Sequence, residues 1–175
     1  MNILTDRMIR AARLDVGLYE EVEADQGATG QAMAVVVLSS VAAGVATVAT
    51  RGIGGIVLGT VGALVSWVVW AYLTYLIGTR ILPEPQTKAD VGELLRTLGF
   101  ASSPGVIRVV GIVPGLTMLS FLVAAVWMLV TMVVAVRQAL DYTSTGRAVG
   151  VCVIGFLVQV AILALLFAAL GGPGV

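Results

Sequence analysis

Long runs of mostly apolar residues constrain this sequence more than any other feature. Four of them cover residues 31–50, 53–82, 116–136 and 148–170. A helix of about 20 apolar residues crosses the roughly 30 Å hydrocarbon core of a bilayer, and a soluble domain of this size has no interior to bury so many. The runs predict an all-α fold, a polytopic helical membrane protein in which residues 1–175 form a single membrane domain.

The composition argues against several function classes. Hydrophobic residues make up 59% of the chain and charged residues 11%, and ten basic residues balance ten acidic ones. No basic face for nucleic acid is therefore expected. The chain has no histidine and a single cysteine, Cys152. Without the commonest metal ligand and proton carrier, we expect no catalytic, metal-binding or cofactor-binding residues, and no enzyme.

The number of spans depends on a fifth apolar stretch, 98–113, which Pro104 and Arg108 interrupt. As an α-helix this stretch rises about 24 Å, which is short of the hydrocarbon thickness. If the stretch crosses the bilayer the chain has about five transmembrane helices, and if it only dips in, four. Length alone leaves both topologies open.

Charge bias favours five crossings, because short cytoplasmic loops are rich in Lys and Arg. With five crossings, Arg51 is the basic residue left on the outer side of the membrane. With four crossings, Arg137 and Arg147 also fall on the outer side. The basic residues on the inner side would be Arg7, Arg10, Arg13, Arg80, Lys88, Arg96, Arg137 and Arg147. We therefore expect a multi-pass plasma-membrane protein with its N-terminus cytoplasmic and its C-terminus outside.

Two amphipathic segments are predicted to lie at the membrane interface. Within residues 1–30, the 5–23 segment carries an apolar stripe at helical spacing, with basic residues on another face and an acidic second half. The residues expected to contact lipid headgroups or a protein partner are Arg7, Arg10, Arg13, Glu20, Glu21, Glu23 and Asp25. In mid-chain, Thr87 and Asp90 resemble a capping box, and Val91, Leu94, Leu95 and Leu98 form a second stripe.

Small residues recur every three or four positions at the start of the second span. They are Gly52, Gly55, Gly59, Gly62 and Ser66. Helices in lipid associate through close packing, which small residues permit, so this face is predicted to pack on another helix. The partner is either the first span of the same chain, which we favour because it offers Ser40 and Gly44, or a second copy.

Two polar residues lie inside predicted spans. Arg108 is expected either to extend toward the outer headgroups or to mark a functional site, and no carboxylate lies within the spans to pair with it. Gln159 is expected to hydrogen-bond to another helix.

Three stretches stand out along the chain: LYEEVEAD, ELLRTLGFASSPG, which contains Gly99, Phe100, Ser103 and Pro104, and RQALDYTSTGRA. They resemble the prokaryotic branch of the Yip family of multispanning membrane proteins, and those four residues match a motif of that family. The resemblance implies five spans, a cytoplasmic N-terminus and no catalytic residues. Eukaryotic relatives bind Rab-type GTPases through a longer N-terminal region, whereas about thirty residues precede the first span here, so we do not expect Rab binding.

Two function hypotheses follow. The first is a non-enzymatic scaffold or accessory subunit, in contact with the lipid bilayer and with other membrane proteins or further copies of itself. The alternative is a small transporter or channel, with Arg108, Gln159 and the broken 98–113 helix along its path, because interrupted helices often border substrate sites.

Overall fold

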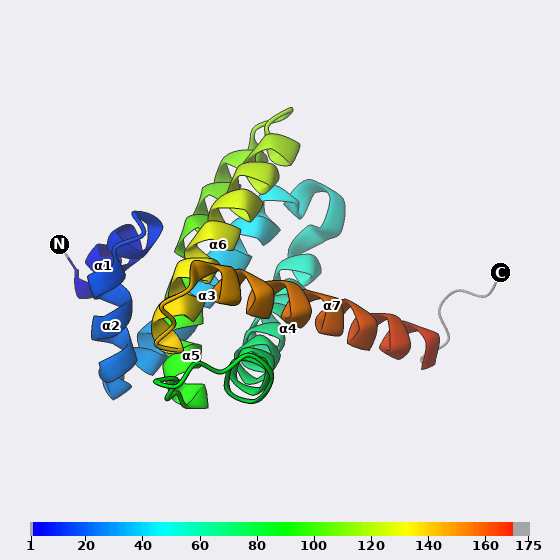
Figure 1. The fold of residues 1–175 in the computed structure, drawn as a ribbon. Coiled ribbons are helices and arrows are strands. Elements are labelled where there is room, and N and C mark those ends of the chain that lie inside the picture. Colours follow the sequence, from blue (N-terminus) through cyan, green and yellow to red (C-terminus); the bar gives the residue numbers. More distant parts are fainter. Residues whose placement is uncertain (1, 170–175) are drawn as a thin grey trace.

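The computed structural model describes residues 2–169, and all the regular structure in that range is helical (Figure 1). The prediction of an all-α, polytopic helical membrane fold is confirmed. Seven α-helices are described: α1 (Ile3–Ala12), α2 (Val16–Ala24), α3 (Thr29–Ala46), α4 (Val48–Leu76), α5 (Val91–Ala101), α6 (Thr117–Ala139) and α7 (Thr145–Ala169). A short 3₁₀ turn η1 (Gln26–Ala28), a π-helical end η2 (Ile77–Ile81) and a 3₁₀ helix η3 (Ser103–Ile112) complete them.

Four helices in the described range are long and apolar enough to cross a membrane: Gln26–Ala46, Val48–Ile81, Thr117–Ala139 and Thr145–Ile162. They correspond to the predicted spans 31–50, 53–82, 116–136 and 148–170, and the last residue of that fourth range lies outside the described residues. The chain is therefore a multi-pass membrane protein. Between α3 and the main part of α4, Gly52 takes φ 66° and ψ −177°, which interrupts the helix and starts it afresh.

The N-terminal segment is two helices and not the single 5–23 helix that its periodicity predicts. Leu14 has φ 63°, a left-handed conformation that ends the first helix, and the Asp15 side chain accepts a hydrogen bond from Gly17 N at 3.0 Å to cap the second. Trp127 of α6 donates a hydrogen bond to Ala12 O at 2.8 Å. Tyr19, which belongs to the apolar stripe of the 5–23 segment, is fully buried in the protein. Both helices thus dock on the bundle.

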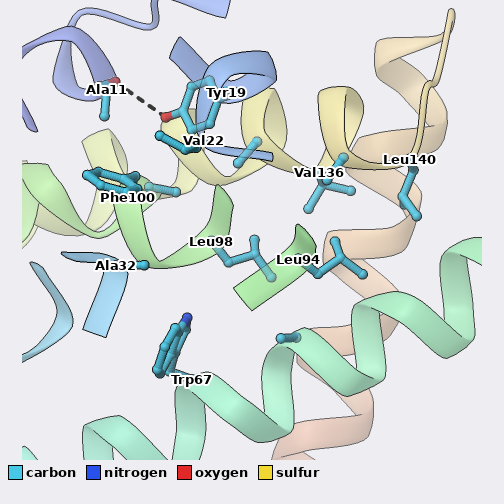
Figure 2. Packing of buried hydrophobic residues seen from close by; sticks show 14 of the residues in the cluster. Ala11, Tyr19, Val22, Ala32, Trp67, Leu94, Leu98, Phe100, Val136 and Leu140 are labelled. Atoms are coloured by element: carbon cyan, nitrogen blue, oxygen red, sulfur yellow. Dashed lines mark hydrogen bonds between the residues drawn. The ribbon is translucent and has the colours of Figure 1, made fainter. Parts of the chain in front are cut away.

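The mid-chain segment also lies within the bundle. Asp90 is the N-cap of its helix, and the side chains of Asp90 and Glu93 form the capping box, which was predicted from the sequence for Thr87 and Asp90. Instead of floating free, α5 contacts α2, α3, α4 and α6, and its Leu94 and Phe100 are fully buried. These residues join the main core, which lies at one end of the bundle around Tyr19, Phe100 and Trp67 (Figure 2).

The end of α5 and the 3₁₀ helix η3 that follows it run alongside α3 in the same direction. A Cβ added to Gly99 would lie 2.7 Å from Ala32 Cβ, and one added to Gly111 would lie 3.1 Å from Ala46 Cβ. A 3₁₀ helix rises about 2.0 Å per residue against about 1.5 Å in an α-helix, so residues 98–112 rise about 28 Å and come close to the hydrocarbon thickness. The change of helix type at Ser103 therefore supplies length that an α-helix of this sequence lacks.

The last helix leads away from the others (Figure 1). It packs on α4, η2 and α6 through its first half, where a Cβ on Gly155 would lie 3.1 Å from the Trp70 ring. Farther along, Phe156, Leu157 and Leu165 are exposed. In a bilayer, these apolar side chains would face lipid or another helix.

Candidate functional site

A network of ion pairs ties α1 to α2. Arg7 is only 5% exposed, and it donates through Nε to Glu21 at 2.9 Å, through Nη2 to Asp25 at 2.9 Å and through Nη1 to Gln31 at 3.0 Å. Arg10 donates to Asp15 at 2.7 Å and to Glu21 at 2.6 Å. The hydrogen bond from Arg10 lowers the pKa of Glu21, and that from Arg7 lowers the pKa of Asp25.

This network changes the role of the predicted contact residues. The guanidinium groups of Arg7 and Arg10 pair with carboxylates of the same chain, because the turn at Leu14 folds α1 back against α2. They do not form the separate headgroup-facing row that one continuous helix would present. Arg13 is exposed beyond this network.

Glu20 and Glu23, the predicted contact carboxylates that are outside the ion-pair network, face a cleft at the same end of the bundle. Glu20 and Glu23 of α2 lie opposite Glu93 of α5 and Asp141, which follows α6, and Ala24 and Gln138 complete a cavity of about 330 Å³. Burial raises the pKa of the Glu23 carboxyl to about 7, and the charges of Glu93 and Asp141 add to the shift. We call this group of four carboxylates the acidic cleft. Within residues 2–169, no set of three or more metal-ligating side chains is placed to hold a metal ion.

Arg96 ties the end of α2 to α5 beside the acidic cleft, a role that was not predicted from the sequence. Its side chain is 6% exposed and donates through Nε to Val22 O at 2.9 Å and to Glu23 O at 3.1 Å. These carbonyls belong to the last turn of α2, where a cation is favourable. The one signal in the sequence was a basic residue on a helix otherwise rich in leucine.

A second missed residue, Glu84, locks the loop after α4 to the loop before α7. It is 9% exposed and accepts hydrogen bonds from Thr143 N at 3.0 Å, Thr143 Oγ1 at 2.8 Å and Gln86 Nε2 at 2.6 Å. Arg147 lies 3.5 Å from its other oxygen. These contacts, led by the Thr143 backbone N–H, lower the pKa of Glu84 to about 2. The sequence signal for this role was the position of Glu84 between two prolines, Pro83 and Pro85.

The opposite end of the bundle holds Arg108. The residues lining a cavity of about 230 Å³ there include Ser40, Thr47, Arg51, Gly59, Arg108 and Phe121. Arg108 Nη2 lies 3.2 Å from Met128 Sδ, and its guanidinium carbon lies 5.5 Å from the centre of the Phe121 ring. The same sulfur lies beside Gly105, where an added Cβ would be 3.0 Å from it. The Arg108 side chain therefore points back along η3 toward Gly105 and the middle of the bundle. The expected extension toward the outer headgroups is not what the structure shows.

Two glycines of the small-residue stripe border this cavity and do not pack closely on another helix of the same chain, so packing of the stripe on a second copy stays a prediction. Gly55 and Gly59 line the cavity, and a Cβ added to Gly59 or Gly62 would meet no described atom within 4 Å. Ser66 is exposed and Gly52 forms the kink. The close contact between α3 and α4 is made by Gly44, whose added Cβ would lie 3.1 Å from Ile56 Cβ.

The structure does not bring Gln159 to Arg108. Gln159 is half-buried on α7, it makes no side-chain hydrogen bond within the described residues, and it does not line the Arg108 cavity. The motif residues do converge. Gly99 touches Ala32, Phe100 is fully buried, and Ser103 Oγ donates to Phe100 O at 2.6 Å just before Pro104 opens η3. The motif therefore makes the joint between α5 and η3.

Comparison with known proteins identifies the family of the chain. A family model described as Yip1 domain matches residues 19–167, which excludes α1 and includes every apolar helix. Neither the curated proteins nor the solved structures contain a significant match to the chain. Since the matched range covers most of the chain, this multi-pass helical protein belongs to the Yip1-domain family.

Proposed function

We propose that this protein is a non-enzymatic membrane scaffold or accessory subunit that receives a basic segment of a partner protein in the acidic cleft. The proposal rests on one observation: a single cavity is lined by four carboxylates from three separate parts of the chain, Glu20, Glu23, Glu93 and Asp141. None of the four takes part in an ion pair among residues 2–169, whereas the neighbouring Glu21 and Asp25 do. A basic partner would relieve the repulsion within the cleft.

The proposal includes five crossings of the plasma membrane, with the N-terminus and the acidic cleft in the cytoplasm and the C-terminus outside. It is supported by the path of residues 99–111, which follow α3 from Ala32 to Ala46. If α3 crosses the bilayer, its parallel neighbour crosses as well.

Affinity capture in mild detergent tests the proposal. We compare the wild type with a variant carrying Glu23→Gln, Glu93→Gln and Asp141→Asn, and with Asp6→Asn as a control outside the cleft. We expect the wild type and the control to recover a second membrane protein at stoichiometric ratio and the triple variant to lose it. Recovery of this polypeptide alone, or of a partner that the triple variant retains, would count against the proposal.

The transporter alternative keeps one favourable observation, the cavity beside Arg108. A transport path through Arg108 and Gln159 is not supported, because Gln159 lies on α7, away from that cavity. Reconstituted vesicles provide the test. A flux that Arg108→Ala abolishes would favour transport, and a flux unchanged by that substitution would remove its main support.

A further inference from the structure

The cavity around Arg108 contains more cationic charge than the chain neutralises there. Arg51 and Arg108 both line it, and no Asp or Glu is among the lining residues. The sequence has no carboxylate from residue 26 to 83 or from 94 to 140, so α3, α4, η3 and α6 carry none that could pair with these cations. An unpaired guanidinium among apolar helices is costly, which makes an external anion favourable.

The present contacts of Arg108 are weak ones for a guanidinium. A thioether sulfur is a poor acceptor, and Arg108 Nε is buried without any hydrogen-bond partner among the described residues. The Phe121 ring covers one face of the group and leaves its donor edge to be satisfied by something else. A guanidinium presents five N–H donors in a planar fork that fits carboxylate or phosphate oxygens.

The kink at Gly52 adds a further favourable feature. Because Gly52 departs from helical geometry, the main part of α4 begins at residue 53, next to Arg51 and Gly55 on the cavity wall. The start of a helix presents free backbone N–H groups and a partial positive charge, both of which favour an anion. Ser40 and Thr47 also line the cavity, but their hydroxyls donate to Val37 O and Ala43 O, so the arginines and the helix start carry the argument.

We propose that this cavity binds a phosphate group, either as the headgroup of an anionic lipid or as a free anion. Its volume of about 230 Å³ equals that of about eight water molecules, enough for one such group. Thr47 and Arg51 lie at the junction of α3 and α4, which the proposed topology places at the headgroup region, with Arg108 farther into the bundle beside Met128 of α6. The site is separate from the acidic cleft at the other end and does not depend on a protein partner.

Binding of defined probes to the delipidated full chain tests the site. Native mass spectrometry with short-chain phosphatidylglycerol should show one molecule retained per chain, and diacylglycerol, which lacks the phosphate, should show none. Arg108→Gln should weaken binding about tenfold, the loss of one charge-assisted hydrogen bond. Inorganic phosphate in competition separates the sources: displacement of the lipid indicates a site open to free anions, and no displacement indicates a site for the lipid headgroup.

Two further variants keep the test decisive. Gly59→Leu adds bulk where a Cβ meets open space, and it should weaken binding without changing any charge. Arg80→Gln removes an exposed arginine at the far end of the Val48–Ile81 helix and should leave binding unchanged. Circular dichroism checks that each variant folds. If Arg108→Gln does not fold, the binding measured with Gly59→Leu decides the test. Equal retention of phosphatidylglycerol by the wild type and Gly59→Leu, or equal binding of diacylglycerol, would overturn the proposal.

Discussion

Arg7 of α1 holds Asp25, the residue that ends α2, by a hydrogen bond of 2.9 Å from Nη2 to Oδ2. The same guanidinium reaches Glu21 and Gln31, so one buried side chain joins α1, α2 and the first turn of α3. The N-terminal helices thus belong to the folded bundle.

Replacing Arg7 by alanine should therefore lower stability. We expect a loss of about 2 kcal/mol, because the substitution leaves Asp25 and Gln31 without the guanidinium and Glu21 with Arg10 alone, although solvent reaches the carboxylates and screens part of the effect. Thermal unfolding in detergent measures it. Arg13→Ala, at an exposed position, is the matched control, and equal unfolding temperatures for the two variants would contradict this account.

Glu23 should make stability depend on pH. Its pKa is raised in the fold to about 7 from an ordinary 4.5, so the folded state binds more protons between those values and stability falls as pH rises from 4.5 to 7. Glu23→Gln should stabilise the protein by about 1 kcal/mol at pH 8, after allowance for solvent screening, and have little effect at pH 4.5. Unfolding curves at both pH values check this, and an equal effect at both would contradict it.

Removing Glu84 should loosen the loop between α6 and α7. Glu84→Ala deletes the acceptor of both Thr143 hydrogen bonds and the partner of Arg147. Trypsin should then cleave after Arg147 several-fold faster, since cleavage requires local opening. Glu20→Gln at the exposed rim of the acidic cleft is the control. Unchanged cleavage in Glu84→Ala would show that the loop is held by other contacts.

Close packing of η3 on α3 predicts a loss of stability on enlarging Gly105 that a second substitution on α3 partly restores. A Cβ on Gly105 would overlap Ser39 Oγ, so Gly105→Ala should destabilise the protein by about 1–3 kcal/mol. Adding Ser39→Gly should restore part of the loss, because it removes the side chain in the way. Gly62→Ala, with open space around it, should not destabilise. Thermal unfolding of Gly105→Ala, Ser39→Gly and the double variant measures the coupling, with Gly62→Ala as the control.

Labelling of single cysteines tests the five-span topology. In a Cys152→Ala background, Pro114→Cys lies just after η3 and Ser144→Cys just before α7, both at exposed positions. We expect a membrane-impermeant maleimide to label the first in intact cells and the second only after permeabilisation. Labelling of Ser144→Cys in intact cells, without permeabilisation, would indicate four crossings or the opposite orientation.

The sequence by itself determined the fold class, the four long apolar helices and the family. Apolar runs of about 20 residues have few alternatives to membrane-spanning helices, and the Gly99, Phe100, Ser103 and Pro104 motif identified a family that the comparison confirmed. These features depend on local composition and spacing, which a linear reading captures.

The tertiary structure decided how the polar residues are used. The turn at Leu14 pairs Arg7 and Arg10 with α2, which takes Glu21 and Asp25 out of the acidic segment and leaves Glu20 and Glu23 to meet Glu93 and Asp141. Close packing against α3 and α6 accompanies the 3₁₀ form of η3, and that form sets the direction of Arg108. Such pairings join residues far apart in the chain, and spacing along one helix carries no information about them.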